Sequence, residues 1–195
     1  MSGGQRPTPM GQVVAVCGMP GSGKGEFAAV IAKQGVPVLS MGDMVRAEVR
    51  RQELAESPGI FGEIAAQLRA QFGEDVLAVR LADAVDELLA KHPVVLIEGM
   101  RGTAERTVFL ARWGEAFASL AVDASPDVRF ERIQHRGRSE DGDRAAFEVR
   151  DAREIGWGLD LIIAESDYKI DNNQDLISFR NDCQKWYLDY TARTQ

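Results

Sequence analysis

The chain has 195 residues, a length that fits one domain with a core of its own. Hydrophobic residues make up 45% and charged residues 27%, which excludes a disordered, collagen-like or disulfide-stapled protein. The net charge of −7 argues against general nucleic-acid binding, which requires a basic surface. Two widely separated cysteines, Cys17 and Cys183, predict a reduced, cytoplasmic protein. No apolar run approaches about 18 residues, so no membrane association is expected.

Residues 1–11 contain Gly and Pro without an apolar stretch, and we expect a flexible tail there, before a single domain over 12–195. In chain order, apolar spacing predicts a strand over 13–17, a helix over 24–34, a strand over 37–40, helices over 43–56, 60–72 and 75–91, a strand over 93–97, a helix over 104–113, a strand over 118–122, helices over 126–136 and 144–164 (broken at 156–158), a strand over 168–171 and a helix over 173–190. This alternation is typical of an α/β fold with a five-stranded parallel sheet and helices on both faces. Ligands of such sheets bind beyond the carboxyl ends of the strands.

The first predicted strand ends at a phosphate-binding sequence. Residues 18–24 read Gly-Met-Pro-Gly-Ser-Gly-Lys and match the G-x-x-x-x-G-K pattern of a P-loop. The backbone N–H groups of such a loop and the following helix N-terminus surround phosphate oxygens, and the lysine reaches the β- and γ-phosphates. We expect ATP to be bound by Gly18, Met19, Pro20, Gly21, Ser22, Gly23, Lys24, Gly25 and Glu26.

The loop lacks the hydroxyl that often binds magnesium in these proteins. Gly25 follows the lysine where Ser or Thr is frequent, and Glu26 stands where Thr is more usual. We therefore expect Mg²⁺ to be held by phosphates, by water and by Glu98, which follows the apolar strand over 93–97 in the Walker-B position. The alternative for Glu98 is a structural partner of an arginine.

Arginines outnumber lysines 18 to 5, and seven of them fall between residues 129 and 153. A guanidinium group binds phosphate through two parallel hydrogen bonds, which favours a phosphate-binding surface. Six acidic residues lie in the same window, so a solvated helix face is an equally good interpretation of the spacing alone.

The loop sequence Gly-x-Pro-Gly-x-Gly-Lys-Gly resembles that of adenylate kinases and related nucleoside monophosphate kinases. Residues 40–49 resemble the start of their monophosphate-binding helix, and residues 98–101 resemble a shortened form of their Asp-Gly-x-Pro-Arg motif. The resemblance implies a small helical acceptor flap over 42–72, with Arg46 and Arg101 on the acceptor's phosphate.

The arginine-rich window over 132–153 resembles the lid region of such a kinase in a very short form. By this resemblance Arg132 covers the donor adenine and Arg136 the donor phosphates, while Arg150 and Arg153 match the paired arginines of the helix that leaves the lid. The residues expected to be catalytic are Lys24, Asp43, Arg136 and Arg150, and those expected to bind the acceptor are Arg46, Arg101, Arg138 and Arg153.

Three departures leave the acceptor open. The lid is nearly absent, the glutamine that reads an AMP base has no counterpart near 103–105, and residues 164–173 look more like dephospho-CoA kinase. In that family an aspartate that aligns with Asp43 is the general base. The whole chain most resembles an archaeal family of adenylate-kinase-like or dephospho-CoA-kinase-like P-loop proteins.

Four residues have two interpretations each. With a phosphate acceptor, Asp43 is expected mainly to cap the helix at Met44. Asn172 and Asn173 either flank the adenine or cap the last helix. Trp157 is expected in the core rather than stacked on a base.

The sequence therefore predicts an ATP- and Mg²⁺-dependent phosphotransferase with a nucleotide-like small-molecule acceptor. The alternative enzyme is a dephospho-CoA kinase, which phosphorylates a ribose hydroxyl. The alternative from another class is an ATP-binding regulatory protein with little turnover. The missing hydroxyl and the short lid favour that last alternative, whereas the many arginines argue against it.

Overall fold

The computed structural model describes residues 11–57, 59–137 and 141–194, so most of the predicted tail and Arg138 lie outside the described residues. Five strands form one parallel sheet in the order β2-β3-β1-β4-β5. They are β1 (Gln12–Cys17), β2 (Val38–Ser40), β3 (Val94–Glu98), β4 (Phe117–Asp123) and β5 (Tyr168–Asp171). The predicted sheet is confirmed.

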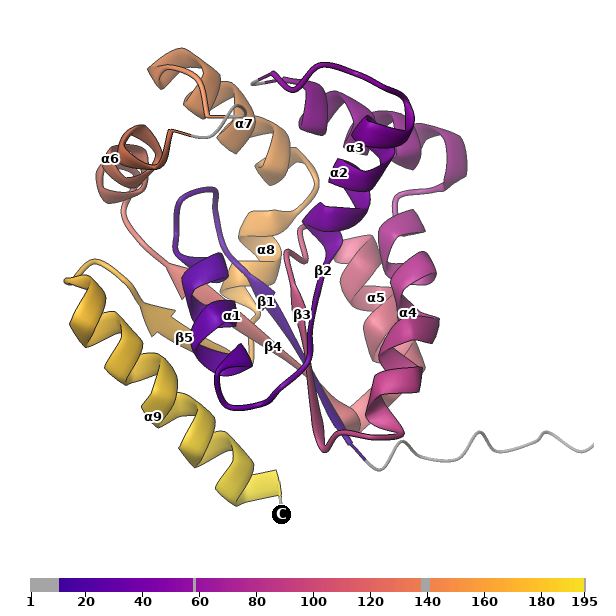
Figure 1. Ribbon diagram of the computed structural model, residues 1–195, viewed down its shortest axis with the longest axis vertical. Helices are drawn as coiled ribbons and strands as arrows, with labels where there is room; N and C mark the ends of the chain where they lie inside the picture. The colour runs from indigo at the N-terminus through magenta and orange to yellow at the C-terminus, as the bar shows by residue number, and fades with distance from the viewer. Residues whose placement is uncertain (1–10, 58, 138–140, 195) are drawn as a thin grey trace, which may run out of the picture.

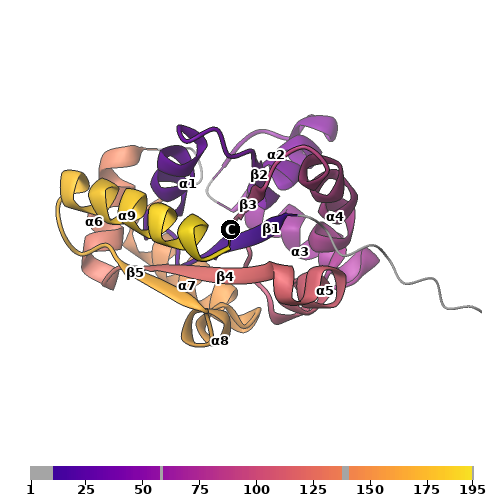
Figure 2. The same ribbon diagram turned by 90° about the horizontal axis from the view of Figure 1, so that it is seen from below.

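Helices cover both faces of the sheet (Figures 1 and 2). One face carries α1 (Lys24–Ala32) and α9 (Leu176–Thr194), and the other carries α4 (Val76–Leu89), α5 (Thr103–Trp113) and α8 (Leu159–Ala164). A short 3₁₀ turn, η1 (Gly114–Ala116), leads from α5 into β4. The remaining helices lie beyond the sheet's carboxyl edge: α2 (Met41–Arg51), α3 (Ile60–Phe72), α6 (Pro126–Arg136) and α7 (Arg144–Gly156).

The alternation of side chains along β1 sorts the core into two layers. Val14 and Val16 pack among residues of α1 and α9, whereas Val13, Ala15 and Cys17 pack among residues of α4, α5 and α8. All five are fully buried, as expected for the central strand of a sheet that is covered on both faces. No helix in the described part of the chain is long and apolar enough to cross a membrane.

Two helix starts differ from the prediction by two residues or more, because the capping residues differ. Helix α2 begins at Met41 instead of Asp43, since the Ser40 hydroxyl accepts from the backbone N–H of Asp43. The expected cap at Asp43 is therefore wrong. Helix α9 begins at Leu176 instead of residue 173, because the Asp175 carboxylate accepts from the backbone N–H of Ile177.

A buried ion pair ties α3 to the core of the domain. The Arg69 guanidinium on α3 donates to the Glu105 carboxylate on α5 at 2.7 Å, and the two side chains are 3% and 0% exposed. The same carboxylate accepts from the backbone N–H groups of Arg101 and Gly102. Glu105 thus fixes both the α3 helix and the loop that carries Arg101.

We predict that Glu105→Ala lowers the free energy of unfolding by about 3–5 kcal/mol, because it leaves the buried Arg69 charge without its partner. Urea unfolding followed by circular dichroism measures this loss. The matched control is Glu115→Ala, at an exposed glutamate of η1, which should stay within about 0.5 kcal/mol of the parent. Equal stability of the two variants would contradict the role given to Glu105.

Candidate active site

The P-loop connects β1 to α1 in a backbone conformation that requires glycines. Gly18, Gly21 and Gly23 have φ angles of 148°, 81° and 107°, which residues other than glycine rarely adopt. Space is also limiting: a Cβ on Gly18 would lie 2.3 Å from the Val122 carbonyl oxygen, and one on Gly23 would lie 2.2 Å from Asn172 Nδ2. The loop therefore packs directly against the ends of β4 and β5.

Lys24 is buried at the start of α1 and turns back over the loop. Its ammonium donates to the carbonyl oxygens of Gly18 and Met19. Burial lowers the pKa of Lys24 from 10.5 to about 8. Gly18 and Met19 thus orient the lysine through their backbones, and neither lines the main cleft described below.

Two side chains that sequence reasoning assigned elsewhere brace the P-loop. Arg129, one of the seven clustered arginines, is 3% exposed and donates to the Pro20 carbonyl oxygen at 2.9 Å. Its guanidinium also pairs with Asp151 at 2.6 Å. Asn172 is 4% exposed and does not cap α9, whose first turn donates to Asp175; its amide donates to the Ser22 carbonyl oxygen at 2.8 Å. No local sequence signal marks either partner.

A cleft of about 750 Å³ opens beside the loop and gathers most of the predicted site residues. The P-loop contributes Pro20, Gly21, Gly23, Lys24, Gly25 and Glu26 to its lining, the β2 and β3 ends contribute Ser40 and Glu98, and the surrounding helices and loops contribute Arg46, Arg101, Arg132, Arg136 and Arg150. Ser22 is also a P-loop residue, but it is fully buried and does not line the cleft.

Acidic partners orient the predicted arginines. Arg136 forms an ion pair with Asp141. The buried Glu154 carboxylate contacts both Arg101, at 2.9 Å, and Arg150, at 3.4 Å. Burial alone would raise the pKa of Glu154, but the two arginines lower it below its usual range. Glu154 is a site residue that sequence reasoning missed, because a glutamate in a helix rich in charged residues carries no distinguishing pattern.

Asp43 and Arg46 lie one helical turn apart on α2 and form an ion pair of 2.8 Å. Arg46 lines the cleft, whereas Asp43 does not, and the Asp43 side chain is 68% exposed. Arg46 thus lies with the other residues that line the cleft, and Asp43 does not.

The other clustered arginines divide between the cleft and the surface. Arg132 donates to Asn172 Oδ1 at 3.2 Å and lines the cleft, and burial lowers its pKa. Arg153 lines a smaller neighbouring hollow. Arg144 lies at the surface, paired with Glu148 at 3.0 Å and with Asp127. Neither interpretation of the cluster thus holds for all of it.

Trp157 packs against the core, as expected. The Arg69 guanidinium lies 4.1 Å from the centre of its ring, a cation–π contact, and the ring itself lies among partly buried core residues.

Glu98 ends β3 inside the cleft, as predicted, and accepts from the Ser40 hydroxyl at 2.9 Å. In the described part of the chain no three acidic, histidine or cysteine side chains cluster as a metal cage would require. One carboxylate with a neighbouring hydroxyl nevertheless fits Mg²⁺, which takes most of its ligands from phosphates and water.

Fold and loop together define a P-loop nucleotide-binding domain of the kinase-like type. The sequence matches the family described as AAA domain over residues 17–148, more than half of the chain. The structure is similar to that of TT1252 from Thermus thermophilus, with a TM-score of 0.64 and 19% identity over 92% of this chain and 97% of that one. It is also similar to shikimate kinase from Acinetobacter baumannii, with a TM-score of 0.58 and 15% identity over 95% and 96%. At these identities the two structures support the fold alone.

More closely related sequences specify the family. The chain is 36% identical over 184 residues to a UPF0200 protein of Methanosarcina barkeri. The matched region covers 94% of this chain and 98% of that protein. It is 38% identical over 175 residues to a UPF0200 protein of Thermococcus sibiricus, and the matched region covers 89% of this chain and 92% of that protein. The chain belongs to the UPF0200 family.

We predict that affinity for a non-hydrolysable ATP analogue falls as the pH rises through about 8. Bound phosphates favour charged Lys24, so above the pKa of the free protein, about 8, binding must take up a proton. The loss approaches tenfold per pH unit until the pKa of the complex is reached. Isothermal titration calorimetry at several pH values measures it.

Lys24→Arg keeps its charge at every pH and should flatten this profile, whereas the exposed control Lys33→Arg should keep the parent's profile. A parent affinity that does not change between about pH 7 and about pH 10 would contradict the assignment of Lys24 to the phosphates.

Proposed function

We propose that the protein is an ATP-dependent phosphotransferase that transfers the γ-phosphoryl group to the phosphate of a nucleotide-like small molecule. The observation that carries the proposal is the shared cleft. Lys24 and the P-loop line it together with the arginines expected at the acceptor, Arg46 and Arg101. A donor phosphate at the loop and an acceptor phosphate at these arginines would meet in one cleft.

In this phosphoryl transfer the protein itself would form no covalent bond to the substrates. An acceptor phosphate oxygen attacks the γ-phosphorus, the bond from that phosphorus to the bridging oxygen breaks, and ADP leaves with the bond's electron pair. The rate then depends on alignment and on neutralising the charge of the transferring group. Lys24, Arg136 and Arg150 supply positive charge along the cleft for this purpose.

Magnesium would neutralise the donor's β- and γ-phosphates. The residues that would hold it through water are Glu98 and Ser40, which are hydrogen-bonded to each other in the cleft. The Ser40 hydroxyl comes from the end of β2, and it offers from another strand the kind of oxygen that the P-loop lacks at Gly25. A Cβ on Gly25 would meet nothing within 4 Å, so a hydroxyl there is missing by sequence and not for lack of space.

A hydroxyl acceptor, as in dephospho-CoA kinase, is the second candidate. It requires a general base within hydrogen-bond reach of the hydroxyl. Asp43 is outside the cleft lining and its carboxylate already accepts from Arg46 at 2.9 Å. These contacts support the phosphate acceptor over the hydroxyl acceptor.

The direct test is ADP formation from ATP and Mg²⁺ over a panel of nucleoside monophosphates and dephospho-CoA. Stimulation by at least one monophosphate is expected. Stimulation by dephospho-CoA alone would replace the proposal with the second candidate, and ATP binding without stimulation by any acceptor would support the regulatory alternative.

Two variants of α2 separate the acceptor types. For a phosphate acceptor we predict that Arg46→Ala raises the acceptor KM by about tenfold or more, through loss of a charge-assisted hydrogen bond worth about 1.5–3 kcal/mol. Asp43→Asn should have a mild effect, since it removes only an exposed partner of Arg46. Steady-state kinetics with acceptor varied at saturating ATP measures both.

The contradicting result is a loss of kcat in Asp43→Asn of about a hundredfold or more with normal helix content, because a general base contributes about 10²–10⁴ in rate. That pattern would assign Asp43 to proton removal from a hydroxyl.

A further inference from the structure

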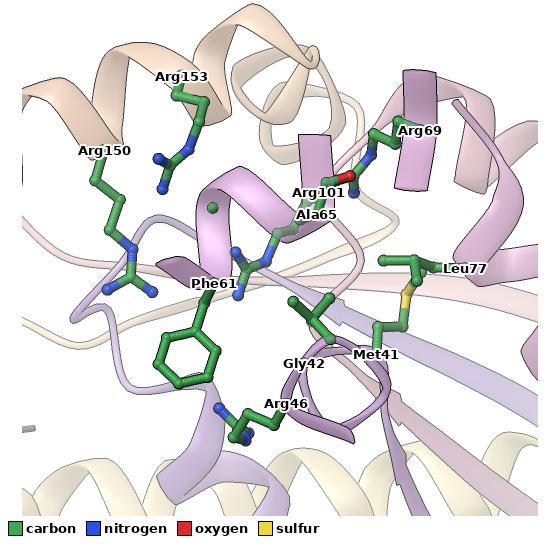
Figure 3. Close-up of a pocket in the computed structure, with 13 residues that line it drawn as sticks. Met41, Gly42, Arg46, Phe61, Ala65, Arg69, Leu77, Arg101, Arg150 and Arg153 are labelled. Carbon is green, nitrogen blue, oxygen red and sulfur yellow. The ribbon is translucent and has the colours of Figure 1, made fainter. Parts of the chain in front are cut away.

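Beside the main cleft lies a smaller hollow of about 40 Å³ between α2, α3 and α7 (Figure 3). The two spaces share Arg46, Arg101 and Arg150 in their linings. An acceptor whose phosphate contacts Arg46 and Arg101 therefore presents its other end to this hollow. A hollow of this volume holds only a few water molecules, so it admits one edge of a ring and not a whole purine.

The lining of the hollow offers hydrogen-bond donors and almost no acceptors. Five of its 13 residues are arginines (46, 69, 101, 150 and 153), and the other eight are glycines or apolar residues such as Phe61 and Leu77. A guanidinium group has five N–H donors and no acceptor. Among the described residues, no side-chain oxygen or neutral nitrogen lines this space. The carbonyl groups of Gly42 and Gly62 belong to helices, where backbone hydrogen bonds engage them.

Two of these donors make no hydrogen bond in the part of the chain that the structure describes: Nη1 of Arg150 and Nε of Arg153, both buried. Nη1 of Arg150 has an ion-pair contact of 3.8 Å with the Asp141 carboxylate, whereas Nε of Arg153 has no such contact among the ion pairs of the described residues. The Arg153 guanidinium lies against the backbone of α3, where a Cβ on Gly62 would come within 2.1 Å of it. Figure 3 shows Arg46, Arg101, Arg150 and Arg153 extending into the space around Phe61. A buried donor of this kind is satisfied by an acceptor atom from water or from a ligand.

We propose that the hollow selects an acceptor nucleotide whose base edge carries oxo groups, and disfavours one whose edge carries an exocyclic amine. This inference rests on the proposed function. A carbonyl oxygen such as O6 of hypoxanthine or O4 of uracil accepts from the arginines. An amino group at the same position turns its N–H bonds toward guanidinium donors and leaves both sides unpaired.

The test uses two pairs of monophosphates that differ in this exocyclic group and in the protonation of the ring nitrogen beside it: inosine against adenosine monophosphate, and uridine against cytidine monophosphate. ADP formation is measured for all four at saturating ATP and Mg²⁺, and the binding of each is measured by calorimetry without ATP. The oxo member of at least one pair is expected to have a kcat/KM and an affinity at least about tenfold higher than its amino partner. Equal values, or a preference for the amino member in both pairs, would overturn the inference.

Arg153→Gln tests the residue behind the selection, because glutamine offers an acceptor as well as a donor. The ratio between oxo and amino substrates is expected to fall by about threefold or more. The matched control is Arg144→Gln, at a surface arginine of the same helix that lines neither space, which should keep the parent's ratio. A variant of Arg153 that lowers all four substrates equally would make its role structural and would contradict the inference.

The two measurements separate this inference from the proposed function. ADP formation with all four monophosphates and no preference within either pair would remove the inference and leave the phosphotransferase. Selective binding of the oxo members without any ADP formation would keep the inference and remove the phosphotransferase. Neither binding nor turnover with any of the four would overturn both.

Discussion

One buried carboxylate, that of Glu154, holds two of the arginines that line the cleft. It contacts Arg101 from the loop after β3 and Arg150 from its own helix. Lys24 lies near enough to lower its pKa as well. Several cations brought together in one cleft repel one another unless an anion lies among them. Glu154 supplies that anion from beneath, so the cationic groups of its neighbours can face the open side, where phosphates would bind.

The ends of all five strands contribute to the same site. The P-loop follows β1, Ser40 ends β2 and Glu98 ends β3, while α6 with Arg132 and Arg136 follows β4. Asn172 follows β5 and braces the loop from below. In a parallel sheet these ends meet at one edge, which explains why residues distant in the sequence share one cleft.

What the sequence predicts well is local in origin. The strands, the P-loop and the exact span of α3 at 60–72 follow from apolar periodicity and from glycines at fixed offsets within short windows. The parts it missed depend on partners far along the chain. Arg129 contacts Pro20 across 109 positions, and Asn172 contacts Ser22 across 150. Only folding brings such pairs together, and a single sequence leaves an arginine that binds phosphate indistinguishable from one that supports a loop.

Asp43 shows the same limit at short range. Two hydroxyl or carboxylate side chains, at positions 40 and 43, were each able to cap α2, and local propensity does not choose between them. The hydrogen bond from Ser40 to Glu98 lies at the junction of two strands and fixes Ser40 as the cap. Asp43 is thereby released to pair with Arg46.

The buried ion pair between Arg69 and Glu105 has a consequence for how the proposed acceptor would enter the cleft. A movement of α3 away from the sheet would break this ion pair and leave the two charges without each other. The free-energy cost would be about 3–5 kcal/mol. At about 1.4 kcal/mol per factor of ten, fewer than about one molecule in a hundred would stand open in that way at any moment. An acceptor bound at Arg46 and Arg101 would therefore approach through the mouth of the cleft, which the P-loop also lines. A donor at the P-loop would use the same opening, so the fold itself would constrain the order in which two such substrates bind.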